Sequence, residues 1–185
     1  VGTAASAAES GGHALQRPDG KFLVILGNTT SNTSIYDPVA NTFVAGPAIV
    51  GTAVSTVNEG GHSFQRPDGK FLVILGNGTS NTSIYDPVAN SFVPGPAIVG
   101  TAASLAEEGT YSIQRPDGKF LVVLGNNTSN TSIYDPVANT FVPGPAITGT
   151  AANAAEYGGH AIQRPDGKFL IILGNSTSNT SIYDP

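Results

Sequence analysis

The sequence predicts an all-β protein, a β-propeller built from four-stranded antiparallel blades. Two observations predict this fold. A unit of 49 residues occurs four times along the 185-residue chain without insertion or deletion. Each unit contains four short strand-like segments separated by turn sequences, and a period of about 40–50 residues with four strands is typical of propeller blades.

The repeats span residues 1–49, 50–98, 99–147 and 148–185. Two landmarks recur at the same interval, the proline of "QRPDGKF" and the tyrosine of "SIYDP": Pro18, Pro67, Pro116 and Pro165, then Tyr36, Tyr85, Tyr134 and Tyr183. The fourth repeat is incomplete, because it lacks the eleven residues that correspond to "VANTFVPGPAI". We therefore expect the last blade to lack its outer strand and to expose an unpaired edge.

The first two strands of each blade are predicted on either side of "RPDG". In the first repeat these are "HALQ" at 13–16 and "KFLVILG" at 21–27. Proline presets φ for a type I turn, and glycine takes the positive φ of the bulge that follows. The continuous apolar run of "KFLVILG" is typical of a strand buried on both faces.

The third and fourth strands are predicted on either side of "PVAN". They are "TSIYD" at 33–37 and "TFVAG" at 42–46 in the first repeat. Asp37 precedes proline, and we expect its side chain to form an Asx-type turn. The Ala-rich "GTAASAAE" at 2–9 is compatible with a short helix, but its glycine favours a connector.

The unit "GGHALQRPDGKFLVILGN…SIYDPVANTFVAGPA" resembles the kelch repeat in the order and spacing of its motifs. The resemblance covers nearly all of each repeat and implies a propeller, usually with more than four blades. Two positions depart from the family pattern. Asn28 and its counterparts replace the second glycine, and asparagine tolerates a positive φ. Phe43 and its counterparts stand where tryptophan is usual, which gives a smaller anchor between blades.

The composition excludes several classes of protein. Charged residues make up only 11% of the chain, the net charge is −5, and four of the eight basic residues are lysines at one repeated turn position. No basic patch is available to follow nucleic acid. There is no cysteine, so no disulfide framework is predicted. Apolar runs are too short to span a membrane. No signal peptide is visible and the first residue is not Met, which we interpret as a processed mature chain.

Histidines occupy one repeat position, His13, His62 and His160, and Tyr111 takes it in the third repeat. Three close imidazoles are the usual basis of a histidine metal site. The tyrosine breaks that symmetry, so we predict hydrogen bonds between blades rather than a metal site. The aspartates lie in turns, and the geometry of a turn is enough to explain aspartate at these positions. We expect no cofactor and no catalytic activity.

The connector between blades is the most variable part of the repeat and carries glutamates. Loops on one face of a repeat protein are where partners usually bind. The sequence gives two interpretations, a solvated rim and a binding rim. The residues concerned are Glu9, Glu59, Glu107, Glu108 and Glu156.

The loop between the second and third strands contains nine Asn-x-Ser/Thr triplets over the four repeats. The triplet is the acceptor for N-glycosylation in secreted proteins, but a loop rich in Asn, Ser and Thr also produces it by composition alone. Sugars would compensate for the low charge of the surface. The candidates are Asn28, Asn32, Asn77, Asn81, Asn126, Asn127, Asn130, Asn175 and Asn179.

The sequence thus predicts a non-catalytic scaffold, extracellular or at the cell surface. Its expected partners are copies of itself, forming a filament, layer or larger ring through blade contacts, together with covalent glycans. Near-identical blades favour such assembly, since any blade face complements any other. Two alternatives stay open: a ligand- or sugar-binding propeller resembling a lectin, and an engineered symmetric propeller.

Overall fold

The computed structural model describes residues 8–53, 56–101, 105–149, 155–174 and 178–185. Within these ranges the chain forms fifteen strands and no helix. The strands make three four-stranded sheets and one three-stranded sheet, and every neighbouring pair of strands is antiparallel. The prediction of an all-β chain of repeated antiparallel sheets is confirmed.

Each repeat gives one sheet, and its strands are ordered as they occur in the chain. The first sheet contains β1 (His13–Gln16), β2 (Phe22–Ile25), β3 (Thr33–Asp37) and β4 (Thr42–Ala45). The second contains β5 (His62–Gln65), β6 (Phe71–Ile74), β7 (Thr82–Asp86) and β8 (Ser91–Pro94). The third contains β9 (Tyr111–Gln114), β10 (Phe120–Val123), β11 (Thr131–Asp135) and β12 (Thr140–Pro143). The last contains β13 (His160–Gln163), β14 (Phe169–Ile172) and β15 (Thr180–Tyr183).

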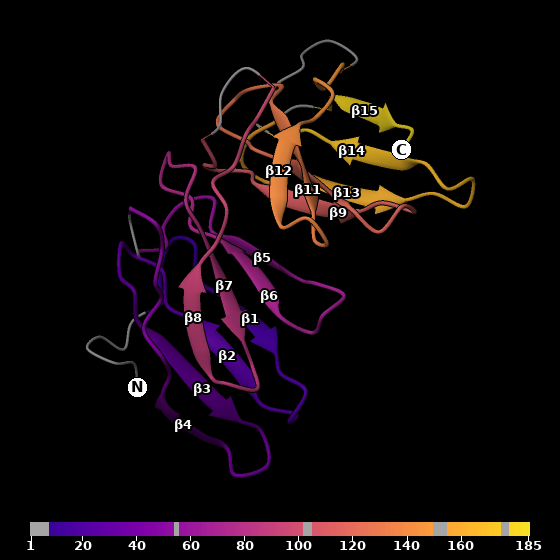
Figure 1. Cartoon of the computed structure of the whole chain (residues 1–185). Helices are drawn as coiled ribbons and strands as arrows, with labels where there is room; N and C mark the ends of the chain where they lie inside the picture. Colours follow the sequence, from indigo (N-terminus) through magenta and orange to yellow (C-terminus); the bar gives the residue numbers. More distant parts are fainter. Residues whose placement is uncertain (1–7, 54–55, 102–104, 150–154, 175–177) are drawn as a thin grey trace.

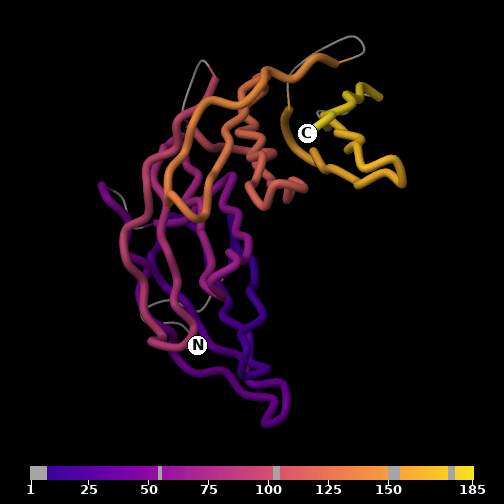
Figure 2. The backbone as a smooth tube through the Cα atoms, turned by 45° about the vertical axis from the view of Figure 1, so that its right-hand side comes forward, coloured from indigo at the N-terminus to yellow at the C-terminus, as the bar shows by residue number. Residues whose placement is uncertain are grey.

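The four sheets follow one another along an open arc, with the first sheet at one end of the molecule and the last sheet at the other (Figures 1 and 2). The first strands of the last three sheets approach one another, since β9 contacts both β5 and β13. The fourth strands make no comparable contacts among the described residues. The sheets therefore fan out from their first strands.

The turns have the geometry that their sequences predict. Gly20 has a φ of 78°, and Arg17 donates its backbone N–H to the Lys21 carbonyl across the first turn. The Asp37 carboxylate accepts the backbone N–H groups of Val39 and Ala40, both at 3.0 Å. This is the Asx-type turn expected before "PVAN".

The asparagine after the second strand has the positive φ that the sequence predicts in the first three repeats. Asn28, Asn77 and Asn126 have φ values of 54°, 56° and 55°. Asparagine reaches this left-handed region at lower cost than other residues with a side chain, because its short polar group can bond locally. The prediction is confirmed for these three positions, and Asn175 lies outside the described residues.

Each sheet has two different apolar faces, because side chains alternate along a strand. On the aliphatic face, the first sheet presents Leu15, Leu23, Ile25 and Ile35. These residues form one buried cluster with the opposite, aromatic face of the second sheet, which presents Phe71, Val73, Tyr85 and Phe92. The same pairing joins the second sheet to the third and the third to the last.

Among the described residues, the last sheet contains β13, β14 and β15 and no fourth strand. In each complete sheet the third strand pairs with a fourth, as Tyr134 in β11 does with Phe141 in β12. Tyr183 in β15 has no such partner among the described strands. The expectation of an incomplete last sheet is confirmed.

Because internal sheet pairs provide the core, truncating an internal aromatic side chain should cost far more than truncating its terminal counterpart. Phe92 is 7% exposed and Phe43, at the same repeat position in the first sheet, is 48% exposed. We expect Phe92→Ala to lower the free energy of unfolding by about 3–5 kcal/mol, and Phe43→Ala to lower it by about 1 kcal/mol or less in dilute protein. Urea denaturation measures both, and equal losses would contradict the described packing.

Candidate interaction surfaces

An arginine–tyrosine contact crosses the junction between the first two sheets. The Arg17 guanidinium donates to the Tyr85 hydroxyl at 2.6 Å and to the Asn90 side-chain oxygen at 2.7 Å. It also donates to the Pro87 carbonyl at 3.3 Å, and its Cζ lies 6.0 Å from the centroid of the Tyr85 ring. Burial raises the pKa of Tyr85, so the hydroxyl stays protonated and donates to Asn90 at 2.9 Å.

The same contact recurs at the other two junctions. Arg66 donates to Asn139 at 3.0 Å, and its Cζ lies 5.9 Å from the centroid of the Tyr134 ring. The Arg115 Cζ lies 6.0 Å from the centroid of the Tyr183 ring. The side chains of these arginines are mostly buried, with exposed fractions of 10% for Arg17 and Arg66 and 18% for Arg115.

The fourth arginine contacts no further sheet among the described residues. Arg164 pairs with Asp166 in its own turn at 2.9 Å, and its side chain is 43% exposed. At the other end of the molecule, Tyr36 donates to Asn41 at 3.0 Å. Its counterpart Tyr85 makes the same bond while also accepting from an arginine. One end of the chain therefore carries the arginine of this contact, and the other end carries its tyrosine and asparagine.

The two terminal sheets also leave one apolar face each uncovered. The aromatic face of the first sheet is partly exposed and consists of Phe22, Val24, Tyr36 and Phe43. The aliphatic face of the last sheet is partly exposed and consists of Ile162, Leu170, Ile172 and Ile182. Their counterparts inside the array are buried against each other at all three junctions. The two free faces are thus the two halves of one interface type.

The loop that carries the Asn-x-Ser/Thr triplets packs against the connector of the following sheet. The backbone N–H of Thr29 donates to the Val57 carbonyl at 3.0 Å, and Val57 donates to the Thr30 carbonyl at 3.1 Å. Equivalent bridges join Thr79 to Ala106 and Thr128 to Ala155. The loop is therefore part of the junction between sheets.

The candidate asparagines fall into two groups according to their exposure. Those of the first triplet in each loop are exposed: Asn28, Asn77, Asn126 and Asn127. Those of the second triplet are buried or half-buried: Asn32, Asn81, Asn130 and Asn179. A sugar needs an accessible side-chain nitrogen, so the structure favours the first group as attachment sites. Asn175 lies outside the described residues.

The structure brings part of the glutamate rim together. The Glu108 carboxylate lies beside Glu59 from the preceding connector, and their repulsion raises the pKa of Glu59. The Tyr157 hydroxyl donates to Glu108, which raises the pKa of Tyr157 to about 12, with a smaller contribution from Glu156. Glu9 contacts the first sheet through its backbone N–H, which donates to the Leu26 carbonyl at 2.9 Å.

The three histidines do not meet at one point. His13 bonds the Gly11 carbonyl through Nδ1 at 2.7 Å, and His62 bonds Ser112 of the third sheet through Nε2 at 2.9 Å. His160 is exposed. Among the described residues no group of three His, Asp or Glu side chains is placed to hold a metal ion. The His62–Ser112 bond is of the inter-sheet kind that the sequence predicted.

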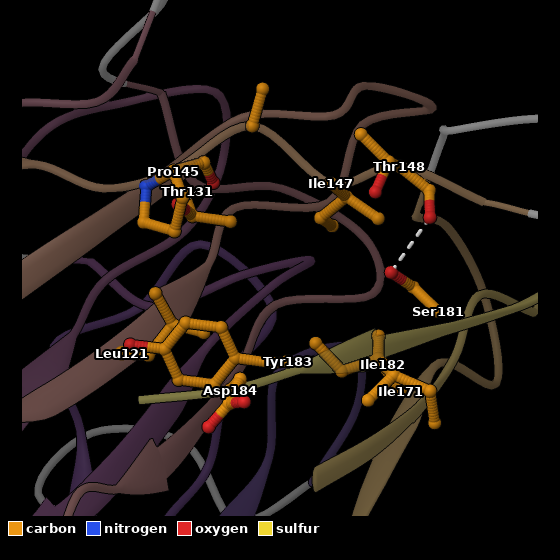
Figure 3. Close-up of a pocket in the computed structure, with 11 residues that line it drawn as sticks. Leu121, Thr131, Pro145, Ile147, Thr148, Ile171, Ser181, Ile182, Tyr183 and Asp184 are labelled. Atoms are coloured by element: carbon orange, nitrogen blue, oxygen red, sulfur yellow. Dashed lines mark hydrogen bonds between the residues drawn. The ribbon is translucent and has the colours of Figure 1, made fainter. Parts of the chain in front are cut away.

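A cavity of about 250 Å³ lies between the third and last sheets (Figure 3). Leu121, Thr131 and Ile147 line it from the third sheet and its connector. Ile171 and Tyr183 line it from the last sheet.

Sequence reasoning missed the arginine–tyrosine contact. The "RPDG" motif predicts only a turn, and Arg17 does pair with Asp19 inside that turn at 3.0 Å. A signal was nevertheless present, because arginine precedes Pro-Asp-Gly in all four repeats although the turn itself does not need it.

No protein-family model and no curated protein matches this chain. Similar solved structures include a protein of unknown function from Dyadobacter fermentans, with a TM-score of 0.59 and 12% identity over 94% of this chain and 60% of that one. The extracellular domain of a hybrid two-component system from Bacteroides thetaiotaomicron has a TM-score of 0.58 and 11% identity over 91% of this chain and 23% of that one.

An auxiliary nutrient-binding protein from Bacteroides ovatus has a TM-score of 0.56 and 10% identity over 92% of this chain and 46% of that one. At these identities the likeness concerns the fold alone. This chain spans less than two thirds of the length of each of these structures. Within the described residues there is no helix long and apolar enough to cross a membrane.

The buried His62 should make stability depend on pH. Burial, with the nearby His13, lowers the pKa of His62 from 6.5 to about 4. The unfolded chain therefore binds this proton more readily, so stability is lost as the pH falls from 6.5 through 4. We expect the native chain to lose about 3 kcal/mol more than His62→Gln between pH 7 and pH 4. Denaturant titrations at both pH values measure this difference.

The matched control is His160→Gln, which changes the exposed histidine of the same repeat position. It leaves the buried His62 in place, so the loss of stability that His62 causes on acidification should remain. If His62→Gln behaved in the same way, the buried, neutral state of His62 would be refuted.

Proposed function

We propose that this chain is a non-catalytic interaction scaffold of the β-propeller type that associates head to tail with copies of itself. One observation carries the proposal. The aromatic face of the first sheet and the aliphatic face of the last sheet are uncovered, and their counterparts pair at every junction inside the chain.

The interface between two copies would repeat an internal junction. Arg164 of one copy would approach Tyr36 and Asn41 of the next, as Arg17 approaches Tyr85 and Asn90 within the chain. Ile162 and Ile182, which are 51% and 48% exposed, would cover Phe43. Burial of apolar area supplies most of the stabilisation in such contacts.

The propeller part of the proposal is supported by the strand order within each sheet and by the stacking of successive sheets face to face. The resemblance to kelch repeats points to the same architecture. A head-to-tail contact closes into a ring if its rotation permits, and otherwise continues into a filament. Both outcomes cover the free faces of every copy except those at filament ends.

The proposal predicts concentration-dependent association that depends on both faces. We expect Ile162→Asp to abolish it, because the new carboxylate would be buried against an apolar face. Arg164→Ala should weaken it at least about tenfold, since it removes a charged hydrogen-bond donor and a cation–π contact. Sedimentation velocity over a range of protein concentrations measures both effects.

The control is Val88→Asp, which places the same charge on a turn residue that is 92% exposed and lies outside both faces. It should associate as the native chain does. A native chain that stays monomeric at all accessible concentrations would refute the proposal. Association that Ile162→Asp leaves intact would refute the assigned interface.

We also propose that the scaffold is extracellular or at the cell surface and carries N-linked glycans. The low charge and the exposed first-triplet asparagines support this proposal. Peptide mass spectrometry of native material should find sugar on Asn28, Asn77, Asn126 or Asn127 and none on the buried Asn32 and Asn130. Unmodified asparagine at every exposed position would contradict it.

A further inference from the structure

The loop between β6 and β7 contains the one place in the sequence where glycine directly follows asparagine, at Asn77 and Gly78. In the other three loops the residue after the corresponding asparagine is Thr29, Asn127 or Ser176. The backbone nitrogen of the residue after an asparagine can attack the side-chain amide carbon. Glycine hinders this approach least, because it has no Cβ. The second loop therefore has a reactivity that its counterparts lack.

The Asn77 side chain is accessible and lightly held. It is exposed, and its oxygen accepts a hydrogen bond from the Asn58 side-chain nitrogen at 3.3 Å. This distance is beyond the usual range of about 2.7–3.2 Å for such bonds. The backbone has a left-handed φ at three successive residues, 70° at Gly76, 56° at Asn77 and 62° at Gly78. The amide group can therefore leave its partner and turn towards the backbone of Gly78.

Two backbone hydrogen bonds restrain the attacking nitrogen. The Gly78 N–H donates to the Ala106 carbonyl at 3.1 Å, and the Ala106 N–H donates to the Thr79 carbonyl at 2.9 Å. They form part of the junction between the second and third sheets. The nitrogen is free to attack when this bridge opens, and surface loops open at a lower free energy than core strands do. The rate of attack therefore depends on how often the junction opens at this loop.

The surroundings of this loop are acidic. The Asn77 backbone N–H donates to the Glu59 carbonyl at 2.8 Å. The Glu107 carboxylate lies against Gly78, since a Cβ added at Gly78 would be 2.6 Å from Glu107 Oε1. A negative charge created at residue 77 would therefore join a part of the surface that already carries carboxylates, and like charges at short range repel each other.

We propose that Asn77 is a site of spontaneous deamidation. The Gly78 backbone nitrogen forms a bond to Asn77 Cγ, the bond from Cγ to Nδ2 breaks, and Nδ2 leaves as ammonia with the proton from the Gly78 N–H. Water then opens the resulting five-membered imide at either carbonyl. The products are aspartate and isoaspartate, whose backbone is longer by one methylene. Water is the co-reactant, and no atom is oxidised or reduced.

The product loosens the junction at which it forms. The new carboxylate repels Glu107, and the longer backbone of isoaspartate displaces Thr79 from Ala106, to which it is bridged. The reaction also consumes the Asn77 Nδ2 atom, which is the atom that a glycan would occupy. Deamidation and glycosylation of Asn77 therefore exclude each other. The inference does not depend on the association of copies.

The test incubates the folded full chain, made in a host that adds no N-linked sugar, at mildly alkaline pH. Peptide mass spectrometry detects the exchange of NH2 for OH at each asparagine, and an enzymatic assay measures the ammonia released. Asn77 should convert at least about tenfold faster than Asn28 or Asn126, which have no glycine after them. No conversion at Asn77, or equal conversion at all three positions, would overturn the proposal.

Two variants test the role of the glycine. Gly78→Ala should stop conversion at Asn77, although its Cβ would crowd the Glu107 carboxylate. Thr29→Gly builds the same dipeptide in the first loop, where Thr29 already has a φ of 53°. It should make Asn28 convert, so it decides the matter if Gly78→Ala does not fold. An unreactive Asn28 in Thr29→Gly would contradict the proposal.

The consequence for the junction has its own test. Asn77→Asp introduces the charge of the product, and Asn28→Asp introduces the same charge in the first loop. There the Asn28 N–H donates to the Ser10 carbonyl, and Asn58 takes the position of Glu107. Asn77→Asp should therefore lower the urea midpoint more than Asn28→Asp does, and added salt should reduce the difference. Equal midpoints would refute the loosening by charge.

Discussion

The structure depends on one constraint: each sheet is apolar on both faces and therefore needs a neighbour on each side. The central strands β6 and β10 are buried along their whole length. The strands are only four or five residues long, and an isolated small sheet has little stability in water. At three junctions within the chain an aliphatic face stacks on an aromatic face, which buries both and stabilises both sheets. This stacking leaves one face of each kind uncovered at the ends.

Apolar packing alone does not fix how one sheet is oriented on the next, and the arginine–tyrosine contact supplies the directional part. Arg17 reaches from its turn to the phenol, amide and carbonyl groups of the following sheet. A guanidinium has donors in a rigid planar fork, so it satisfies several acceptors only in one geometry. The backbone bridges from Thr30 to Val57 and their repeats add a second fixed point. Both contacts act between successive sheets.

The fold could be predicted closely from the sequence because its local signals agree. The predicted segment at 13–16 is β1, the "RPDG" and "PVAN" turns have the expected geometry, and the last sheet lacks its fourth strand. Contacts between repeats are harder to predict from the sequence. Arg17 pairs with Asp19 inside its own turn and also donates to Tyr85 across the junction. The pairing inside the turn already explains the arginine, so the local sequence does not indicate the contact across the junction. Asn32 is buried in a loop that is bridged at Thr30 to Val57 of the next repeat, a contact that the local sequence does not indicate.

The central claim is that one type of interface joins sheets within a chain and chains to each other. A structure of the associated species by electron cryomicroscopy tests it most directly. The account predicts the Arg164 guanidinium of one copy over the Tyr36 ring of the next, at about the 6.0 Å seen between Arg17 and Tyr85, with Ile162 and Phe43 buried between them. An assembly in which the copies meet elsewhere and both faces remain in solvent would contradict it.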